Sequence, residues 1–333
     1  MRQESSINTS IIIPHKNDFS SLKKLLFHLD DSLYSDCEIL VVDSSAHHIY
    51  VNLEEIAKQS TVSVKIIRGD NYYPGHARNI GAKSALGQIL FFLDSKTIPS
   101  KNCLADGLLL LGQDYQSLVI GKFQSIEYTL FGKIVKAATF GNIPHYSIPG
   151  TLIYKKLFLQ SGGFNPIIRA GEDIDWLNRL KQIGCTIKKP TDVTLIYSGL
   201  PDSLLGIAKK WYLYSMENAK VNILTIQKSV YFSFLLFFIL YLAYRWNYIF
   251  TDGAWDSSPY FIPHLNKVLW STLGICYISL RALILPLQRQ EKLTFLLPVN
   301  FIFVAIVSLI MDFAKIPGRI YGFWKMLTYT NKL

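Results

Sequence analysis

The chain has 333 residues, half of which are hydrophobic, and a formal net charge of +10. A positive charge of this size is typical of proteins that bind nucleic acid or an anionic membrane surface. The sequence contains no nucleic-acid-binding motif and its basic residues cluster around apolar runs, so we predict a membrane partner and no nucleic acid.

The first part of the chain alternates between short apolar runs and helical patterns. The expected strands lie at residues 8–14, 38–43, 62–67 and 88–94, and the expected helices at 19–29, 49–59 and 75–86. A continuous apolar run such as 38–43 is typical of a strand that is buried on both faces of a parallel sheet. The alternation predicts a Rossmann-like α/β domain with a mostly parallel central sheet.

The same domain continues through a second, less regular half. Strand signals lie at residues 118–126, 151–154 and 186–196, a glycine turn at 162–164 and a helical pattern at 172–183. We place the end of this domain at residue 205. The four cysteines of the chain lie far apart and form no zinc-type pairs, which favours a reducing compartment; they are Cys37, Cys103, Cys185 and Cys276.

The last third of the chain consists of long apolar runs between basic segments. The runs lie at residues 230–244, 268–287 and 293–311. A helix needs about 20 residues to cross a bilayer, so we predict two to three transmembrane helices within residues 229–313. Residues 206–228 are expected to form a basic amphipathic segment at the membrane interface, and residues 314–333 a basic aromatic tail. Three apolar runs in series argue against buried helices of a soluble domain.

The distribution of positive charge predicts the orientation in the membrane. Several lysines precede the first apolar run, namely Lys209, Lys210, Lys220 and Lys228. By the positive-inside rule we expect a multi-pass protein of the cell membrane whose N-terminal domain lies in the cytosol. Cations that follow the third run, beginning with Lys315, conflict with strict alternation, so the side of the C-terminus stays open.

Five segments follow one another along the chain: SIIIPHKND, EILVVDSS, GHARNIGAKSALGQILFFLDS, GGF and GEDIDW. Their order and spacing resemble those of family 2 glycosyltransferases with the GT-A fold, over roughly residues 9–220. The resemblance implies that residues 1–205 form a nucleotide-diphospho-sugar transferase domain that inverts the configuration of the transferred sugar.

Three residues are candidates for binding the nucleotide. Asp43 ends a buried strand, and ligands of open α/β sheets bind at such strand ends. The resemblance implies that its carboxylate accepts the N–H of a uracil ring, whereas the alternative is a helix N-cap or turn acid. Pro14 and Asn17 resemble further nucleotide-side contacts of the family, although Pro14 could simply terminate a strand.

The GHARNIG segment is a second candidate for donor binding. Its glycines permit close approach of a ligand, a helix N-terminus favours phosphate, and Arg78 adds several donors. The spacing of Arg78 and Asn79 resembles a donor-binding pattern of the family. The alternative is a surface arginine on an amphipathic helix.

Asp94 and Lys96 stand where the resemblance implies an Asp-x-Asp motif that holds magnesium or manganese against the donor diphosphate. A charged lysine cannot ligate a metal, but it supplies positive charge to a phosphate. Three alternatives stay open. The enzyme is metal-independent and Lys96 does part of the metal's work, the domain is an inactive binding scaffold, or Asp94 alone holds magnesium with water and donor phosphates.

The GEDIDW segment is the candidate catalytic motif. Inverting sugar transfer needs a base that takes the proton of the acceptor hydroxyl, and a carboxylate is the natural group. The resemblance implies that Glu172 and Asp173 supply it, with Asp173 as the base. The alternative is that acids gather in the first turn of a helix because of its dipole.

Four residues are assigned to the acceptor side, and each has a structural alternative. Gly163 and Phe164 resemble the family's acceptor-side turn, but could form an ordinary turn before a helix. Trp176 could stack on the acceptor sugar or fill the core. Asp175 could face the acceptor or belong only to the helix start.

These observations predict an inverting glycosyltransferase of the hexosyltransferase type that uses a UDP-linked donor. The expected acceptor is a lipid-linked or membrane-proximal glycan in polysaccharide or glycolipid synthesis. The main alternative is a non-catalytic membrane scaffold that binds a nucleotide sugar or a partner enzyme. A nucleotidyltransferase is disfavoured because PHKNDFSS, after the first strand, is not a glycine-rich phosphate loop, and few spans disfavour a transporter.

Overall fold

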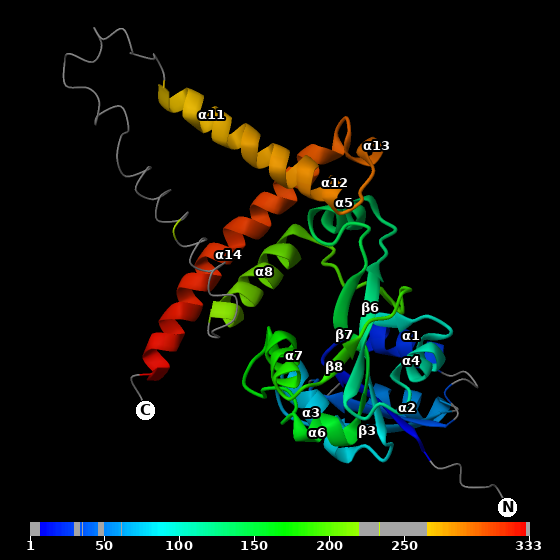
Figure 1. Ribbon diagram of the computed structural model, residues 1–333. Helices are drawn as coiled ribbons and strands as arrows, with labels where there is room; N and C mark the ends of the chain where they lie inside the picture. The colour runs from blue at the N-terminus through cyan, green and yellow to red at the C-terminus, as the bar shows by residue number, and fades with distance from the viewer. Residues whose placement is uncertain are drawn as a thin grey trace, which may run out of the picture.

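The protein consists of an α/β domain from which a group of C-terminal helices extends (Figure 1). The computed structural model describes residues 7–29, 34, 36–45, 50–60, 62–219, 233 and 265–330. The predicted apolar run at 230–244 falls outside these residues except for position 233.

The first half of the sheet is parallel, as the sequence predicts. It contains β1 (Thr9–His15), β2 (Cys37–Asp43), β3 (Ser63–Arg68) and β4 (Ile89–Phe92), in the order β3-β2-β1-β4. All seven residues of β1 and of β2 are buried, which explains their continuous apolar runs. Strand β3 lies at the sheet edge and is partly exposed, which explains its alternating pattern.

Three helices connect these parallel strands. They are α1 (Phe19–Leu29), α2 (Tyr50–Gln59) and α3 (Pro74–Ser84). Helix α3 begins with proline, whose fixed φ suits the first helical position. Gly81 brings α3 onto the sheet, because a Cβ atom there would lie 2.5 Å from Cγ2 of Ile12.

The second half of the sheet is mixed. It contains β5 (Thr97–Pro99), β6 (Ser117–Ser125), β7 (His145–Tyr154), β8 (Thr186–Lys188) and β9 (Leu195–Tyr197). Strand β7 runs antiparallel to both β4 and β6, whereas β8 and β9 run parallel to β6. The parallel sheet therefore continues into a mixed extension, and β5, which pairs with β9, is a strand that the sequence does not predict.

Four further helices belong to the α/β domain: α4 (Cys103–Leu111), α5 (Leu130–Ala138), α6 (Lys155–Gln160) and α7 (Glu172–Gln182). Helix α7 begins at the predicted GEDIDW segment. Helices α4 and α5 are not predicted. Helix α5 lies beside the C-terminal helices (Figure 1), where Val135 packs with Val304 and Val307 in a second hydrophobic cluster.

The C-terminal region is helical throughout its described part. It contains α8 (Leu204–Ala219), α11 (Leu265–Ile278), the π-helix η3 (Ser279–Ile284), α12 (Leu285–Gln288), α13 (Leu293–Leu296) and α14 (Asn300–Thr330). Two stretches, Ser271–Gln288 and Asn300–Lys325, are long and apolar enough to cross a membrane. The predicted basic aromatic tail, residues 314–333, is therefore not a separate segment, because helix α14 continues through most of it.

Helices α8 and α14 lie side by side along much of their length (Figure 1). Glycines allow this contact, because a Cβ atom at Gly318 would lie 2.4 Å from the carbonyl oxygen of Tyr212. At Gly322 it would lie 2.2 Å from that of Met216. Small residues four positions apart permit close packing of helices in membrane proteins. The interface helix that the sequence predicts is therefore held by the longest apolar helix.

Candidate functional site

A cleft of about 570 Å³ lies at the carboxyl ends of β1 and β4. It is lined by Pro14, His15, Lys16, Asn17, Asp18, Ser44, Tyr72, Tyr73, Pro74, Ala77, Asp94, Ser95, Lys96, Arg169 and Tyr197. Backbone groups at such strand ends are free to meet a ligand, and this is where open α/β sheets bind nucleotides. We call this cavity the strand-end cleft.

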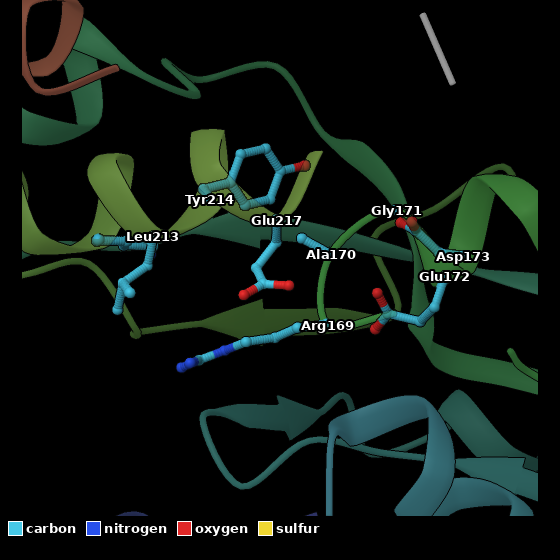
Figure 2. Close-up of a pocket in the computed structure, with 9 residues that line it drawn as sticks. Arg169, Ala170, Gly171, Glu172, Asp173, Leu213, Tyr214 and Glu217 are labelled. Atoms are coloured by element: carbon cyan, nitrogen blue, oxygen red, sulfur yellow. The ribbon is translucent and has the colours of Figure 1, made fainter. Parts of the chain in front are cut away.

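A second cavity of about 290 Å³ lies between α7 and α8 (Figure 2). Its lining residues are Arg169, Ala170, Gly171, Glu172, Asp173, Lys210, Leu213, Tyr214 and Glu217. Figure 2 shows Tyr214 and Glu217 reaching from α8 towards the loop that carries Arg169, with Glu172 and Asp173 at the start of α7. Arg169 lines both cavities, so the strand-end cleft and this helix cavity adjoin there.

Four of the predicted nucleotide-side residues line the strand-end cleft: Pro14, Asn17, Asp94 and Lys96. The turn after β4 fixes Asp94, whose Oδ1 accepts a hydrogen bond from the backbone N–H of Lys96 at 3.0 Å. The exposed Lys96 side chain lies 3.4 Å from Oδ2 of Asp18. Asn17 has a positive φ of 55°, and its backbone N–H donates to Oγ of Ser45 at 2.7 Å.

The structure places Asp43 behind the cleft rather than in its lining. The side chain is completely buried, with Oδ1 2.7 Å from Nδ1 of His15 and accepting a hydrogen bond from Oγ of Ser45 at 2.6 Å. Burial raises the pKa of Asp43, but the hydrogen bonds with His15 and Ser45 outweigh burial and lower the pKa overall. Asp43 therefore links the ends of two neighbouring strands, and its contact with the base stays a prediction.

Arg78 and Asn79 also lie away from the strand-end cleft. Arg78 is buried, with Nη1 3.6 Å from Oε1 of Glu172 and its guanidinium 5.5 Å from the centre of the Phe164 ring. The amide of Asn79 donates to the carbonyl oxygen of Phe164 at 2.7 Å and accepts from its backbone N–H at 2.8 Å. This pair fixes the glycine turn and the start of α7, and its contact with donor phosphates stays a prediction.

The four predicted acceptor-side residues serve the packing of the domain. Gly163 has a φ of +64°, which favours glycine, and a Cβ atom there would lie 2.5 Å from Oδ1 of Asn79. Phe164 and Trp176 are almost fully buried and face each other in an aromatic cluster. Asp175 pairs with Arg179 at 2.8 Å. Phe164 and Trp176 are thus held within the core, whereas Asp175 is partly exposed, and the contacts of these residues with an acceptor stay a prediction.

The two candidate catalytic acids both line the helix cavity at the N-terminus of α7. Glu172 is only 9% exposed, and burial raises its pKa to about 7 although Arg78 opposes the shift. Oδ1 of Asp173 accepts a hydrogen bond from the backbone N–H of Ile174 at 2.9 Å. Glu172 faces a buried cation, whereas Asp173 has no ion pair in the described part of the chain.

Sequence reasoning missed several residues that line the cavities. Arg169 comes from an irregular loop, and Lys210, Tyr214 and Glu217 come from α8. Burial and the nearby charge of Lys96 lower the pKa of Lys210 to about 8, against the opposing effect of Asp94. No local motif marks these residues, because α8 reaches the site only through tertiary packing.

The residues around Asp94 do not fit a divalent metal held by protein ligands. Within the described ranges, no group of three or more His, Cys, Asp and Glu side chains is arranged to hold a metal ion. One oxygen of Asp94 already accepts a backbone hydrogen bond, and the neighbouring Asp18 pairs with Lys96. The second acid of the family's motif is thus replaced by a cation.

Comparison with known proteins agrees with this architecture. A family model described as glycosyl transferase family 2 matches residues 10–172. An uncharacterised glycosyltransferase of Haemophilus influenzae is 25% identical over 190 residues, 52% of this chain and 62% of the relative. Staphylococcus aureus TarS, a poly(ribitol-phosphate) β-N-acetylglucosaminyltransferase, is 23% identical over 175 residues, 49% of this chain and 30% of the relative.

Among solved structures, S. aureus TarS 1–349 in complex with UDP-GlcNAc matches with a TM-score of 0.46 and 16% identity, covering 66% of this chain and 69% of that chain. The chain spans less than two-thirds of the length of either curated relative. The family model at residues 10–172 covers the parallel first half of the sheet. The mixed extension of the sheet and the strand-end cleft lie within or beside these residues. Residues 10–172 therefore carry a glycosyltransferase family 2 domain, and the α/β domain to which they belong has a GT-A-like mixed sheet.

Proposed function

We propose that this protein is an inverting glycosyltransferase that moves a sugar from a UDP-linked donor to a hydroxyl group of a lipid-linked or membrane-proximal glycan. The carrying observation is that the strand-end cleft and the helix cavity adjoin at Arg169, with carboxylates on the far side of the second cavity. Two reactants bound in adjoining cavities meet in a fixed geometry, which lowers the entropic cost of their reaction.

The donor is proposed to occupy the strand-end cleft. Its nucleoside lies near Pro14 and Asn17, where the rings of Tyr72 and Tyr73 also line the cleft and offer flat surfaces for a base. Lys96 supplies positive charge to the diphosphate. The activity for which S. aureus TarS is named, transfer of an N-acetylglucosaminyl group, supports a sugar donor of this class for the matched region.

The acceptor is proposed to occupy the helix cavity, with Asp173 as the catalytic base. Its carboxylate takes the proton of the acceptor hydroxyl while the hydroxyl oxygen attacks the anomeric carbon. The bond from that carbon to the diphosphate breaks on the opposite side, so the configuration inverts. Glu172 is assigned a positioning role, because it pairs with Arg78 and so holds the start of α7 in place.

The location at a membrane is also part of the proposal. The cavity wall formed by α8 is packed against α14, which has the length and composition of a membrane-spanning helix. An acceptor attached to a lipid would therefore reach the cavity from the membrane side. We propose a multi-pass cell-membrane protein whose catalytic domain, residues 1–205, lies in the cytosol.

Turnover by the full-length, detergent-solubilised protein tests this proposal. A panel of nucleotide sugars is offered with a membrane lipid extract as acceptor source, in the presence and absence of EDTA. We expect sugar transfer from a UDP-linked donor. Binding of a nucleotide sugar without transfer or donor hydrolysis under any condition would favour the alternative, a non-catalytic scaffold, which the presence of Lys96 at the metal position suggests.

A further inference from the structure

Three cationic side chains gather where the two cavities meet. Lys96 lines the strand-end cleft, Lys210 lines the helix cavity, and Arg169 lines both. They come from the turn after β4, from α8 and from the loop before α7, respectively. Side chains of one charge converge from three separate segments only at a cost in repulsion, which an anionic ligand offsets.

Lys210 is held in an unusual environment for a lysine. Its Nζ donates hydrogen bonds to the hydroxyl of Tyr197 and the carbonyl oxygen of Gly199, both at 3.3 Å. It lies 5.5 Å from the ring centre of Trp211. No carboxylate oxygen of the described residues lies within ion-pair distance of Nζ. These contacts fix the position of the ammonium group without neutralising its charge.

The two other cations are similarly available to an anion. The exposed Arg169 guanidinium makes no hydrogen bond or ion pair with the described residues. Lys96 pairs with Asp18 at 3.4 Å, but this pair is solvent-exposed and such pairs contribute little. Asp94 and Glu127 act electrostatically on Lys210, and Glu172, Asp173 and Glu217 line the same cavity, but none of these acids forms an ion pair with Lys210 among the described residues. The ammonium group of Lys210 is therefore held in place without a carboxylate partner.

We propose that Lys210 and Arg169 join Lys96 in binding the diphosphate of the nucleotide-sugar donor, so that helix α8 supplies part of the donor site. This inference rests on the proposed glycosyl transfer. It names residues that would neutralise the charge of the diphosphate at a place where the residues around Asp94 do not form a metal site. A diphosphate lying at the junction would place the anomeric carbon next to the helix cavity, where Asp173 lies.

The preference for UDP over UMP tests this inference, because only a diphosphate reaches all three cations. Dissociation constants are measured by calorimetry on the full-length protein in detergent with EDTA present. We expect Lys210→Met to weaken UDP binding roughly tenfold to a hundredfold, as expected for a lost hydrogen bond to a charged group, and to affect UMP less. Lys210→Arg, which keeps the charge, is expected to restore most of the preference.

Two further variants sharpen the test. Arg169→Met removes an exposed side chain that no fold contact requires, and we expect the same selective loss of UDP affinity. Lys209→Met is the matched control, because Lys209 is the exposed neighbour of Lys210 on α8 and lines neither cavity. It is expected to bind both nucleotides as the wild type does.

Three results would overturn the inference. A wild type without preference for UDP, variants whose preference is unchanged, or equal losses for UMP and UDP would each show that these cations do not hold the diphosphate. Such results leave the proposed function standing as long as the wild type binds UDP. A wild type that binds neither nucleotide would contradict the proposed function itself, and this inference with it.

Discussion

At the residue scale, the site separates two adjacent carboxylates by their surroundings. Glu172 is buried against Arg78, whereas Asp173 faces the helix cavity and keeps only a short-range hydrogen bond with the backbone of α7. Both belong to the first turn of one helix and line the same cavity, yet only Glu172 pairs with a cation among the described residues. This difference is the reason for assigning the base to Asp173.

Replacing Asp173 with asparagine tests that assignment. The variant keeps the size of the side chain but cannot take a proton, so we expect sugar transfer to fall by about 10²- to 10⁴-fold. UDP affinity is expected to stay at the wild-type value, because Asp173 is not one of the cations proposed to hold the diphosphate. Transfer rates and nucleotide binding are measured on the same preparation. Full transfer activity in the variant would remove Asp173 from the mechanism.

The buried Glu172 predicts a pH dependence of stability. Its pKa is about 7 in the folded protein, compared with 4.5 for an ordinary glutamate. Between pH 4.5 and pH 7 the folded state therefore binds this proton more tightly than the unfolded state does. Stability contributed by this group is therefore present below about pH 4.5 and is lost as the pH rises through about 7. The loss amounts to at most roughly 3 kcal/mol.

The matched variant for this prediction is Glu172→Gln, which does not titrate. Between pH 5 and pH 8 we expect the thermal midpoint of the wild type to fall relative to that of the variant, when both are measured in detergent by tryptophan fluorescence. If the thermal midpoints of the wild type and the variant changed equally across this range, ionisation of Glu172 would not destabilise the folded protein.

At the element scale, the contact between α8 and α14 determines the position of one cavity wall. Gly318 and Gly322 let the two helices approach, and Oγ of Ser215 donates a hydrogen bond to the carbonyl oxygen of Lys315 at 2.9 Å. Lys210, Tyr214 and Glu217 are carried by α8. Their place in the site therefore depends on a helix far from it in sequence.

Leucine at Gly318 is expected to disrupt this contact, because its side chain would collide with the backbone of α8. We expect a destabilisation of about 1–3 kcal/mol, seen as a lower thermal midpoint in detergent, and weaker UDP binding. Gly274→Leu is the control, since a Cβ atom at Gly274 would meet no atom of the described residues within 4 Å. Equal behaviour of the two variants would contradict a structural role of the α8–α14 contact.

At the scale of the whole molecule, the C-terminal helices expose apolar side chains that a water-soluble surface would not tolerate in such number. On α14 these include Ile302, Phe303, Ile306, Leu309 and Phe313. A contiguous apolar surface of this kind marks contact with lipid or with another protein. Asp312 lies among polar partners instead, pairing with Arg281 at 2.9 Å and Lys315 at 2.8 Å. Such pairing suits a charged residue within an apolar helix.

Fractionation of cells that produce the full chain tests the membrane location. We expect the protein to stay in the membrane pellet after extraction with alkaline carbonate, which removes peripheral proteins but leaves spanning helices in place. Solubility after carbonate treatment, with a known spanning protein retained in the same pellet, would contradict insertion of Ser271–Gln288 and Asn300–Lys325.

The sequence by itself determined the elements whose signals are local. The runs that became β1 and β2 are continuous and apolar because both faces of these strands are buried, and the apolar face of α1 is visible in its spacing. The order of five short segments was enough to indicate the family, because each is a local stretch of sequence that can be recognised without the fold. The small strand β5 and the helices α4 and α5 lack comparable local signals.

Only the tertiary structure decided which polar and aromatic residues line the two cavities. Asp43 and Trp176 stand in segments that resemble functional motifs, yet both are completely buried and bonded within the domain. Arg169 and Lys210 carry no motif, yet packing brings them together at the junction of two cavities. The physical reason is that burial and charge at a site depend on contacts between segments far apart in the chain, which a local pattern does not record.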